Sequence, residues 1–238
     1  QWTRDGEAVL PPGDPSIIPA QQTKAGERWA VSAIAPGALE PLAQATVDIV
    51  NSPPQCLTVE LAPLDPTVTS EFTCGCVERL DPDGDAPVDR CRFFVDSVPI
   101  DAPLCALQKG MAQKGQTVQC ELTPSDGQDD GAIVMTPNVV VQNTPPPTPQ
   151  VVVSPTNPAV TDTVECIVLP GGPDLDGDTV LTSIGWSVNG EDVSSTDFAV
   201  SVGELPAQKG DQIVCLGTAS DGADVSASGV SGAVIVIN

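Results

Sequence analysis

The sequence contains no histidine and no tyrosine, and its 238 residues include only 9 Lys and Arg against 32 Asp and Glu. Without His, acid/base or nucleophilic catalysis by imidazole is impossible, and so is a His-ligated metal site. The net charge of −23 excludes the basic face that a nucleic-acid backbone or an anionic membrane surface requires. We therefore expect no nucleic-acid partner.

Aromatic residues make up only 3% of the chain, and no apolar run approaches the roughly 20 residues that span a bilayer. Membrane insertion is therefore not expected. A sugar-binding platform usually displays planar rings, and glycoside hydrolysis needs a cleft lined with acids, whereas the acids here gather in turns. We accordingly expect that the protein is not an enzyme.

Proline and glycine are abundant, with 25 and 21 residues, which is too many for a helical protein. The hydrophobic fraction of 40% and the mean hydropathy of +0.06 nevertheless provide enough apolar surface for a core. These apolar residues are mostly Val, Ile, Leu and Ala in short runs, which is typical of strands. The composition therefore indicates a β-rich protein.

An internal repeat defines the expected domains. Three segments end alike, at Val47–Asn51, Val139–Asn143 and Val234–Asn238, and a proline cluster follows each of the first two. Consecutive prolines favour an extended, stiff linker. We expect modules at residues 1–51, 52–143 and 144–238.

The two later modules share their landmarks in order. Among these are the loops Asp81-Pro-Asp-Gly-Asp85 and Asp174-Leu-Asp-Gly-Asp178, and the turns Ala112-Gln-Lys-Gly115 and Ala207-Gln-Lys-Gly210. Residues 1–51 fit the template only from its middle, so they are expected to be the C-terminal half of a module. Either the chain is a piece of a longer array, or the missing front strands come from another polypeptide.

The last module carries Cys166, Trp186 and Cys215 in Val/Ile-rich or alternating runs, at spacings of 20 and 29 residues. An immunoglobulin-type sandwich has this spacing, with a cystine between facing sheets and a Trp packed against it. Phe93 and Trp2 stand at the equivalent positions of the other modules and are expected, like Trp186, in the core. The fold class expected is all-β, with two complete tandem Ig-like sandwiches and one half module.

These landmarks resemble the tandem Ig-like repeats of large bacterial cell-surface and secreted proteins. The shared motifs are a DxDGD loop, a WxxxG strand, a PAxxxxKG turn and a late SDG, and the resemblance covers essentially the whole chain. It implies an extracellular or cell-surface location and a structural role. In the first module Val31 stands where the second Cys is expected, so that module should lack the cystine between sheets.

Eight cysteines in such a chain indicate an oxidising compartment and structural disulfides. Cys166 is expected to pair with Cys215, and by alignment Cys74 with Cys120. The other four allow three connectivities; a Cys76–Cys91 bridge is sterically reasonable, and Cys56–Cys105 follows by elimination only. A metal site is disfavoured because Cys74-Gly-Cys76 is C-x-C and no His completes it.

The acidic loops present carboxylates at alternate positions, and hard oxygen ligands on a flexible loop suit Ca²⁺. In an Ig-type sandwich, this loop, the later SDG loop and the incoming linker lie at one end. A cation there could clamp successive modules; the alternative, that Asp-Gly is only a turn signal, remains open. The residues concerned are Asp81, Asp83, Asp85 and Asp126 in the middle module and Asp174, Asp176, Asp178 and Asp221 in the last.

The function expected is that of a stalk, adhesin shaft or filament subunit. The incomplete first module could accept strands from other copies of the chain or from upstream modules, as in strand complementation. The alternative is an adhesin module that binds a cell-surface receptor or a glycan through loops at the sandwich ends.

Overall fold

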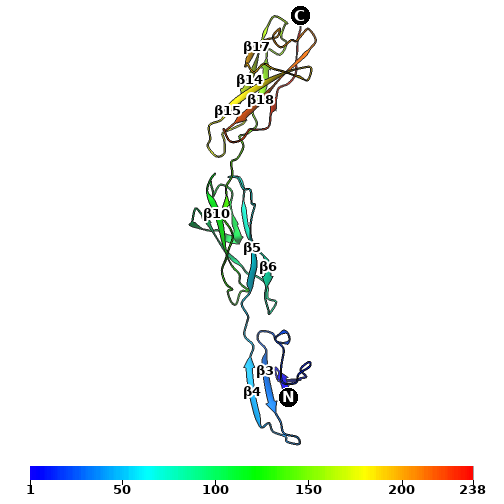
Figure 1. Ribbon diagram of the computed structural model, residues 1–238, viewed down its shortest axis with the longest axis vertical. Coiled ribbons are helices and arrows are strands. Elements are labelled where there is room, and N and C mark those ends of the chain that lie inside the picture. Colours follow the sequence, from blue (N-terminus) through cyan, green and yellow to red (C-terminus); the bar gives the residue numbers. More distant parts are fainter. Residues whose placement is uncertain (238) are drawn as a thin grey trace. The chain divides into compact units, whose positions relative to one another are not determined.

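Short β-branched runs form strands throughout the chain, and a computed structural model describes residues 1–237 (Figure 1). Asn238, the last residue of the third repeated segment, lies outside the described residues. The regular elements are β-strands and two single 3-10 turns, η1 (Ala20–Gln22) and η2 (Pro103–Cys105). No helix in this described part is long and apolar enough to cross a membrane.

Spatial contacts divide the chain into two compact units. Unit 1 comprises Gln1–Leu64, Phe72–Leu107 and Val118–Val139, and unit 2 comprises Asp65–Glu71, Gln108–Thr117 and Val140–Asn238. The expected module boundaries after Asn51 and Asn143 stay a prediction.

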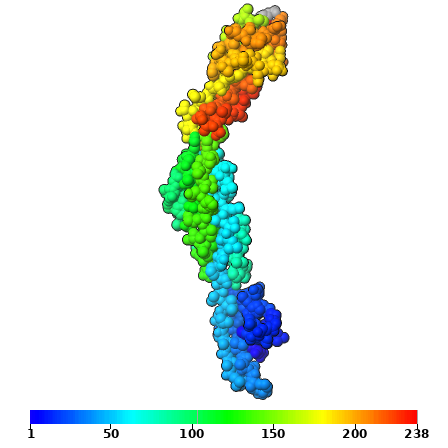
Figure 2. All heavy atoms as spheres, viewed as in Figure 1, coloured from blue at the N-terminus to red at the C-terminus, as the bar shows by residue number. Residues whose placement is uncertain are grey.

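Residues 144–237 fold into a sandwich of two antiparallel sheets, which lies in unit 2. One sheet has the order β13-β14-β17, and the other has the order β16-β15-β18-β19 with β20 also paired to β18. The atoms of this sandwich, coloured from yellow-green to red, form one closely packed body (Figure 2). The strands are β13 (Gln150–Ser154), β14 (Thr163–Leu169), β15 (Leu181–Val188), β16 (Glu191–Val193), β17 (Ala199–Ser201), β18 (Gln212–Ser220), β19 (Gly229–Val230) and β20 (Val234–Ile235).

The middle sandwich repeats this plan. Its sheets have the orders β5-β6-β9 and β11-β10-β7-β8, with β12 also paired to β10. The strands are β5 (Gln55–Ala62), β6 (Phe72–Leu80), β7 (Arg90–Val95), β8 (Val98–Asp101), β9 (Ala106–Leu107), β10 (Thr117–Thr123), β11 (Val134–Met135) and β12 (Val139–Val140).

Residues 1–51 form a single four-stranded sheet of order β2-β1-β3-β4. Its strands are β1 (Trp2–Arg4), β2 (Glu7–Val9), β3 (Arg28–Ala33) and β4 (Ala43–Asp48). Trp29 is 2% exposed and is covered by its own neighbours: the Trp2 ring meets it edge to face, and the Arg4 guanidinium lies 5.9 Å from its ring centre. Side chains of this segment therefore cover part of the sheet face on which Trp29 lies.

The expected core positions recur in register. Trp186 pairs across the sheet with Cys215, Phe93 pairs with Cys120, and Trp2 pairs with Val31. Trp186 and Phe93 are essentially inaccessible to solvent, whereas Trp2 is only partly buried. All three segments thus have a large aromatic residue at the same strand position, although Trp2 lies at the margin of its core.

Two disulfides join facing sheets as expected. Cys166 is bonded to Cys215, with Cα atoms 6.0 Å apart, and Cys74 is bonded to Cys120, with Cα atoms 6.4 Å apart. None of the eight cysteines, all of which lie within residues 1–237, is free. With the alternating apolar strands, these bridges establish an all-β protein built from Ig-like sandwiches.

The other expected pairings, Cys76–Cys91 and Cys56–Cys105, are wrong. Cys56 is bonded to Cys76 because β5 and β6 are neighbours in one sheet, which brings the two Cα atoms within 5.7 Å. Cys91 is bonded instead to Cys105, which lies in η2 only 5.0 Å away between Cα atoms. The adjacency of the first two strands of the module thus decides both bridges, and cysteine spacing alone does not reveal it.

Glycines allow the linkers to approach the loops closely. A Cβ on Gly229 would lie 2.0 Å from the carbonyl oxygen of Pro149, and one on Gly131 would lie 1.8 Å from that of Pro54. A third glycine, Gly171, meets the carbonyl oxygen of Thr148 at 2.1 Å in the same way. The chain at the end of the first proline cluster and just after the second is therefore packed directly against its sandwich.

We expect Gly229→Ala to destabilise the last sandwich by about 3 kcal/mol, because the new methyl group would force the linker backbone away. Gly185→Ala is the matched control, since a Cβ there meets no atom within 4 Å. Urea unfolding should show the loss for Gly229→Ala only. Equal stabilities of the two variants would contradict this close packing.

Candidate functional site

The site that recurs in both units lies where each linker begins, and it is built on an asparagine. In unit 2, Asn143 Nδ2 donates to Oδ2 of Asp221 at 2.8 Å and to Oδ2 of Asp224 at 2.7 Å. The other oxygen of Asp221 accepts the backbone N–H groups of Ala223 and Asp224, which holds the loop closed. A neutral amide thus bridges two carboxylates that would otherwise repel each other.

The preceding acidic loop holds the next linker residue. Asp176 accepts the backbone N–H of Thr144 at 2.5 Å through Oδ2 and its hydroxyl at 3.3 Å through Oδ1. Asp174 shapes this loop, because its Oδ1 accepts the backbone N–H groups of Asp176 and Asp178. Two loops at the same end of the sandwich therefore form hydrogen bonds with two consecutive linker residues.

A lysine completes the site in unit 2. Lys114 Nζ donates to Oδ2 of Asp178 at 2.6 Å. The pKa of Lys114 is raised, chiefly by this hydrogen bond and further by the negative charges of Asp178, Asp176 and Asp221. A positive charge therefore lies at the outer end of this acidic loop.

Unit 1 contains the same arrangement. Asn51 Nδ2 donates to Asp126 at 2.7 Å and to Asp129 at 2.9 Å, and Asp83 accepts the backbone N–H of Ser52 at 2.7 Å. Asp83 also accepts the backbone N–H of Ala25 at 3.1 Å. The hydrogen bonds between acidic loops and linker therefore occur in both units.

Hydrogen bonding to the linker shifts the carboxylates toward the charged form. The pKa of Asp221 falls to about 2, first because Asp224 N–H donates to it and then because Asn143 does. The pKa of Asp126 is lowered chiefly by Asn51, and that of Asp83 chiefly by the backbone of Ser52. At Asp221, Asp126 and Asp83 these hydrogen bonds therefore favour the ionised carboxylate.

These hydrogen bonds bring Asp83 and Asp126 to the first linker and Asp176 and Asp221 to the second. Sequence reasoning missed the two asparagines as the bridging groups, together with Asp129, Asp224 and Lys114. A signal was present for most of them: Asn ends each repeated segment, and the SDG landmark extends to S-D-G-x-D at both Asp129 and Asp224. Lys114 belongs to the shared Lys-Gly turn.

The acidic loops differ in how closely their carboxylates gather. One oxygen from each of Asp174, Asp176 and Asp178 lies within 4.8 Å of the others. Asp81, Asp83 and Asp85 form no such group within residues 1–237. The residues fit a cation in the last sandwich, but those of the middle loop do not.

A second group of potential ligands does not fit a metal. The sulfur atoms of Cys74, Cys91 and Cys120 lie within 4.8 Å of one another, but each belongs to a disulfide. Without a thiolate, these sulfurs cannot ligate zinc.

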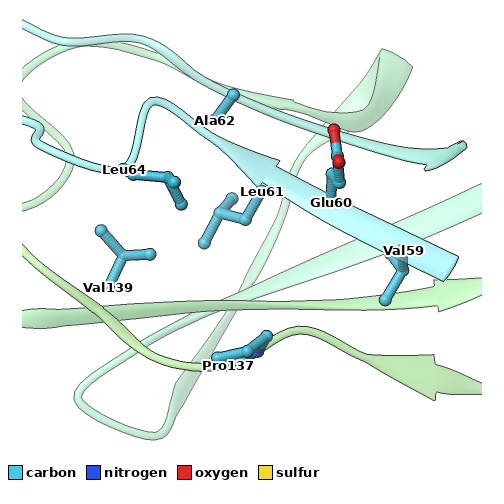
Figure 3. A pocket seen from close by; sticks show the side chains of 7 residues that line it. All are labelled: Val59, Glu60, Leu61, Ala62, Leu64, Pro137 and Val139. Atoms are coloured by element: carbon cyan, nitrogen blue, oxygen red, sulfur yellow. The ribbon is translucent and has the colours of Figure 1, made fainter.

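A separate apolar pocket lies in the middle sandwich, with a volume of about 350 Å³. Leu61 and Val139 point toward one another across it, whereas Glu60 points away (Figure 3). Val59, Ala62, Leu64 and Pro137 complete its lining. The pocket therefore offers apolar contact and no convergent polar groups for catalysis.

No protein-family model matches the chain, and a search of curated proteins gives no match. Among solved structures, chicken CNTN1 FN1-FN3 domains match 90% of this chain and 79% of that one, at 12% identity and a TM-score of 0.36. Domains A168-A170 from titin match 100% of this chain and 88% of that one, at 11% identity and a TM-score of 0.38. Fibronectin(III)-like modules of Clostridium thermocellum CbhA match 76% of this chain and 94% of that one, at 13% identity and a TM-score of 0.33.

We expect Asn143→Ala to raise the pKa of Asp221 from about 2 toward its ordinary 3.8, because one donor to the carboxylate is lost. The control is Asn189→Ala, which removes a comparable donor to Asp211 and should leave Asp221 unchanged. An NMR titration of the Asp carboxyl groups measures both.

The same shift has a consequence for stability. The pKa of Asp221 is lower in the folded state than in the unfolded state. The ionised carboxylate therefore stabilises the fold fully above about pH 4, and this stabilisation is lost as the pH falls toward 2. The stability difference between wild type and Asn143→Ala should therefore shrink between about pH 5 and pH 2. A difference that is constant over this range would contradict the assignment.

Proposed function

We propose that the chain is a structural spacer of an extracellular tandem Ig-like protein, as in a stalk, an adhesin shaft or a filament subunit. The main support for this proposal is that acidic loops form the same hydrogen bonds with both linkers. Asn51 and Asn143 each bridge two carboxylates, and the residue after each asparagine donates its backbone N–H to the acidic loop. Such contacts restrict the linker, as a spacer of defined geometry requires.

Disulfides and charge support the same role. Four disulfides are typical of oxidising, extracellular compartments. Residues 1–51, 52–143 and 144–238 carry net charges of −3, −9 and −11, so successive segments repel one another and stay soluble. We propose a non-enzymatic function; the pocket beside Leu61 has an apolar lining apart from Glu60, which points away from it (Figure 3).

The backbone amide of Thr144 tests this role. In a spacer with restrained linkers its hydrogen should exchange slowly, because Asp176 accepts it, and Asp176→Asn should accelerate exchange by about tenfold through loss of the charged acceptor. Glu191→Gln is the matched control, since it removes one exposed carboxylate elsewhere in the same sandwich. Hydrogen exchange followed by NMR gives both rates.

Free exchange of the Thr144 amide in wild type would contradict a restrained linker. Equal acceleration by Asp176→Asn and Glu191→Gln would show that net charge, rather than this hydrogen bond, governs the linker.

We further propose that copies of the chain, or neighbouring modules, assemble by strand addition at β4. Among the described strands this one pairs only with β3, and all six of its residues are exposed. An unpaired strand edge is a template for another strand. Val47, which pairs with Trp29 and is 55% exposed, is the apolar residue that an added strand would cover.

Light scattering during size-exclusion chromatography tests the assembly. Wild type should show a mass that rises with concentration, and Val47→Lys should remain monomeric because edge lysines oppose strand pairing. Val98→Lys is the control, since Val98 is 62% exposed in another edge strand, β8. A monomeric wild type, or equal effects of both lysines, would argue against assembly through β4.

A further inference from the structure

The acidic loop of the last sandwich contains an unsatisfied buried oxygen. Asp174 is 8% exposed, and its Oδ2 is buried with no hydrogen-bond partner. Its other oxygen, Oδ1, already accepts two backbone N–H groups. A buried carboxylate oxygen without a partner is costly, and a bound cation would offset that cost.

Two further carboxylates lie next to that of Asp174. One oxygen each of Asp174, Asp176 and Asp178 lies within a mutual distance of 4.8 Å. This spacing is close to what oxygen ligands around one cation adopt, given metal–oxygen distances of about 2.3–2.6 Å. We propose that these three residues bind a single Ca²⁺ ion.

The chemistry of the donors selects among cations. All three are carboxylate oxygens, without the sulfur or nitrogen ligands that zinc sites use. They come from one short loop with alternating ligands, which suits the flexible, many-liganded shell of Ca²⁺ better than the strict octahedron of Mg²⁺. Water molecules would complete the shell, since one oxygen from each of the three residues provides only three of the six to eight ligands that Ca²⁺ takes.

The linker amide carries a buried oxygen without a partner, a feature that Asn143 shares with Asn51. Asn143 Oδ1 is buried and has no partner, while its Nδ2 bridges Asp221 and Asp224. Its neighbour Thr144 is bonded to Asp176. A cation in the loop would therefore strengthen the same end of the sandwich to which the linker is attached.

Lys114 is the competing charge. Its ammonium forms an ion pair with Asp178 at 2.6 Å, and it also experiences the charges of Asp176 and Asp221. One lysine cannot neutralise the carboxylates of Asp174, Asp176, Asp178, Asp221 and Asp224. It lies close enough to oppose a divalent ion, so its removal should favour ion binding.

The loop of the middle sandwich provides an internal comparison. Asp81, Asp83 and Asp85 have the same spacing in the sequence, but they form no close group in the described chain. Asp83 accepts backbone N–H groups from two separate segments, at Ala25 and Ser52, whereas both oxygens of Asp176 accept groups of the single residue Thr144. The proposal therefore predicts one Ca²⁺ per chain, and it stands or falls independently of the spacer function.

Isothermal titration calorimetry of the full chain with CaCl₂ tests the proposal. Wild type should bind one Ca²⁺ with a dissociation constant of about 0.1–1 mM, the range of extracellular modules. Asp174→Asn and Asp178→Asn should each weaken binding by about tenfold or more, with folding checked by circular dichroism. Asp83→Asn is the matched control and should bind as wild type does.

Lys114→Met supplies an effect of opposite sign. Loss of its positive charge should tighten Ca²⁺ binding several-fold, which general damage to the site would not do. No binding by wild type up to about 10 mM CaCl₂, undiminished binding by both Asp variants, or weaker binding by Lys114→Met would each overturn the proposal.

Discussion

The bridging hydrogen bonds of Asn51 and Asn143 are the constraint on which the arrangement of each linker depends. Each side-chain amide donates to two carboxylates at once. Hydrogen bonds to ionised acceptors are stronger than neutral ones. Because the amide carries no charge, it joins two carboxylates of one loop to the linker without adding to the repulsion in a chain of net charge −23.

The rest of each junction follows from that contact. With Asn143 fixed, the N–H of Thr144 reaches Asp176, and the backbone at Pro149 lies against Gly229 so closely that no side chain fits there. The proline cluster between them cannot fold back, since proline restricts its own backbone and that of the preceding residue. Polar contacts at one end and close packing at the other thus hold a short, stiff segment.

Much of the fold could be predicted from the sequence because it rests on periodic features. The spacing of Cys166, Trp186 and Cys215 predicted both the sandwich and its disulfide, and the repeat transferred the disulfide to Cys74 and Cys120. The extra bridges of the middle sandwich were predicted wrongly because the last sandwich has no second copy of them for comparison. Their pairing depends on β5 and β6 being neighbours, which the spacing of the cysteines does not reveal.

The acidic site could be predicted only in part. The order of loops in an Ig-type sandwich predicted that Asp174, Asp176, Asp178 and Asp221 lie at one end together with the linker. In the structure, Asp221 and Asp176 form hydrogen bonds with linker residues. Identical spacings nevertheless gave different geometry, since only the loop of Asp174 gathers its carboxylates among the described residues. The two loops share their Asp spacing and differ in the residues between and around them, so the residue types alone do not specify that difference.

The most direct test of the central claim, that side-chain amides fix the linkers, is ¹⁵N relaxation of the backbone at Asn143 and Thr144. We expect order parameters of about 0.85 in wild type, equal to those of rigid strands, and lower values at these residues in Asn143→Ala. Order parameters below about 0.6 in wild type would contradict the claim.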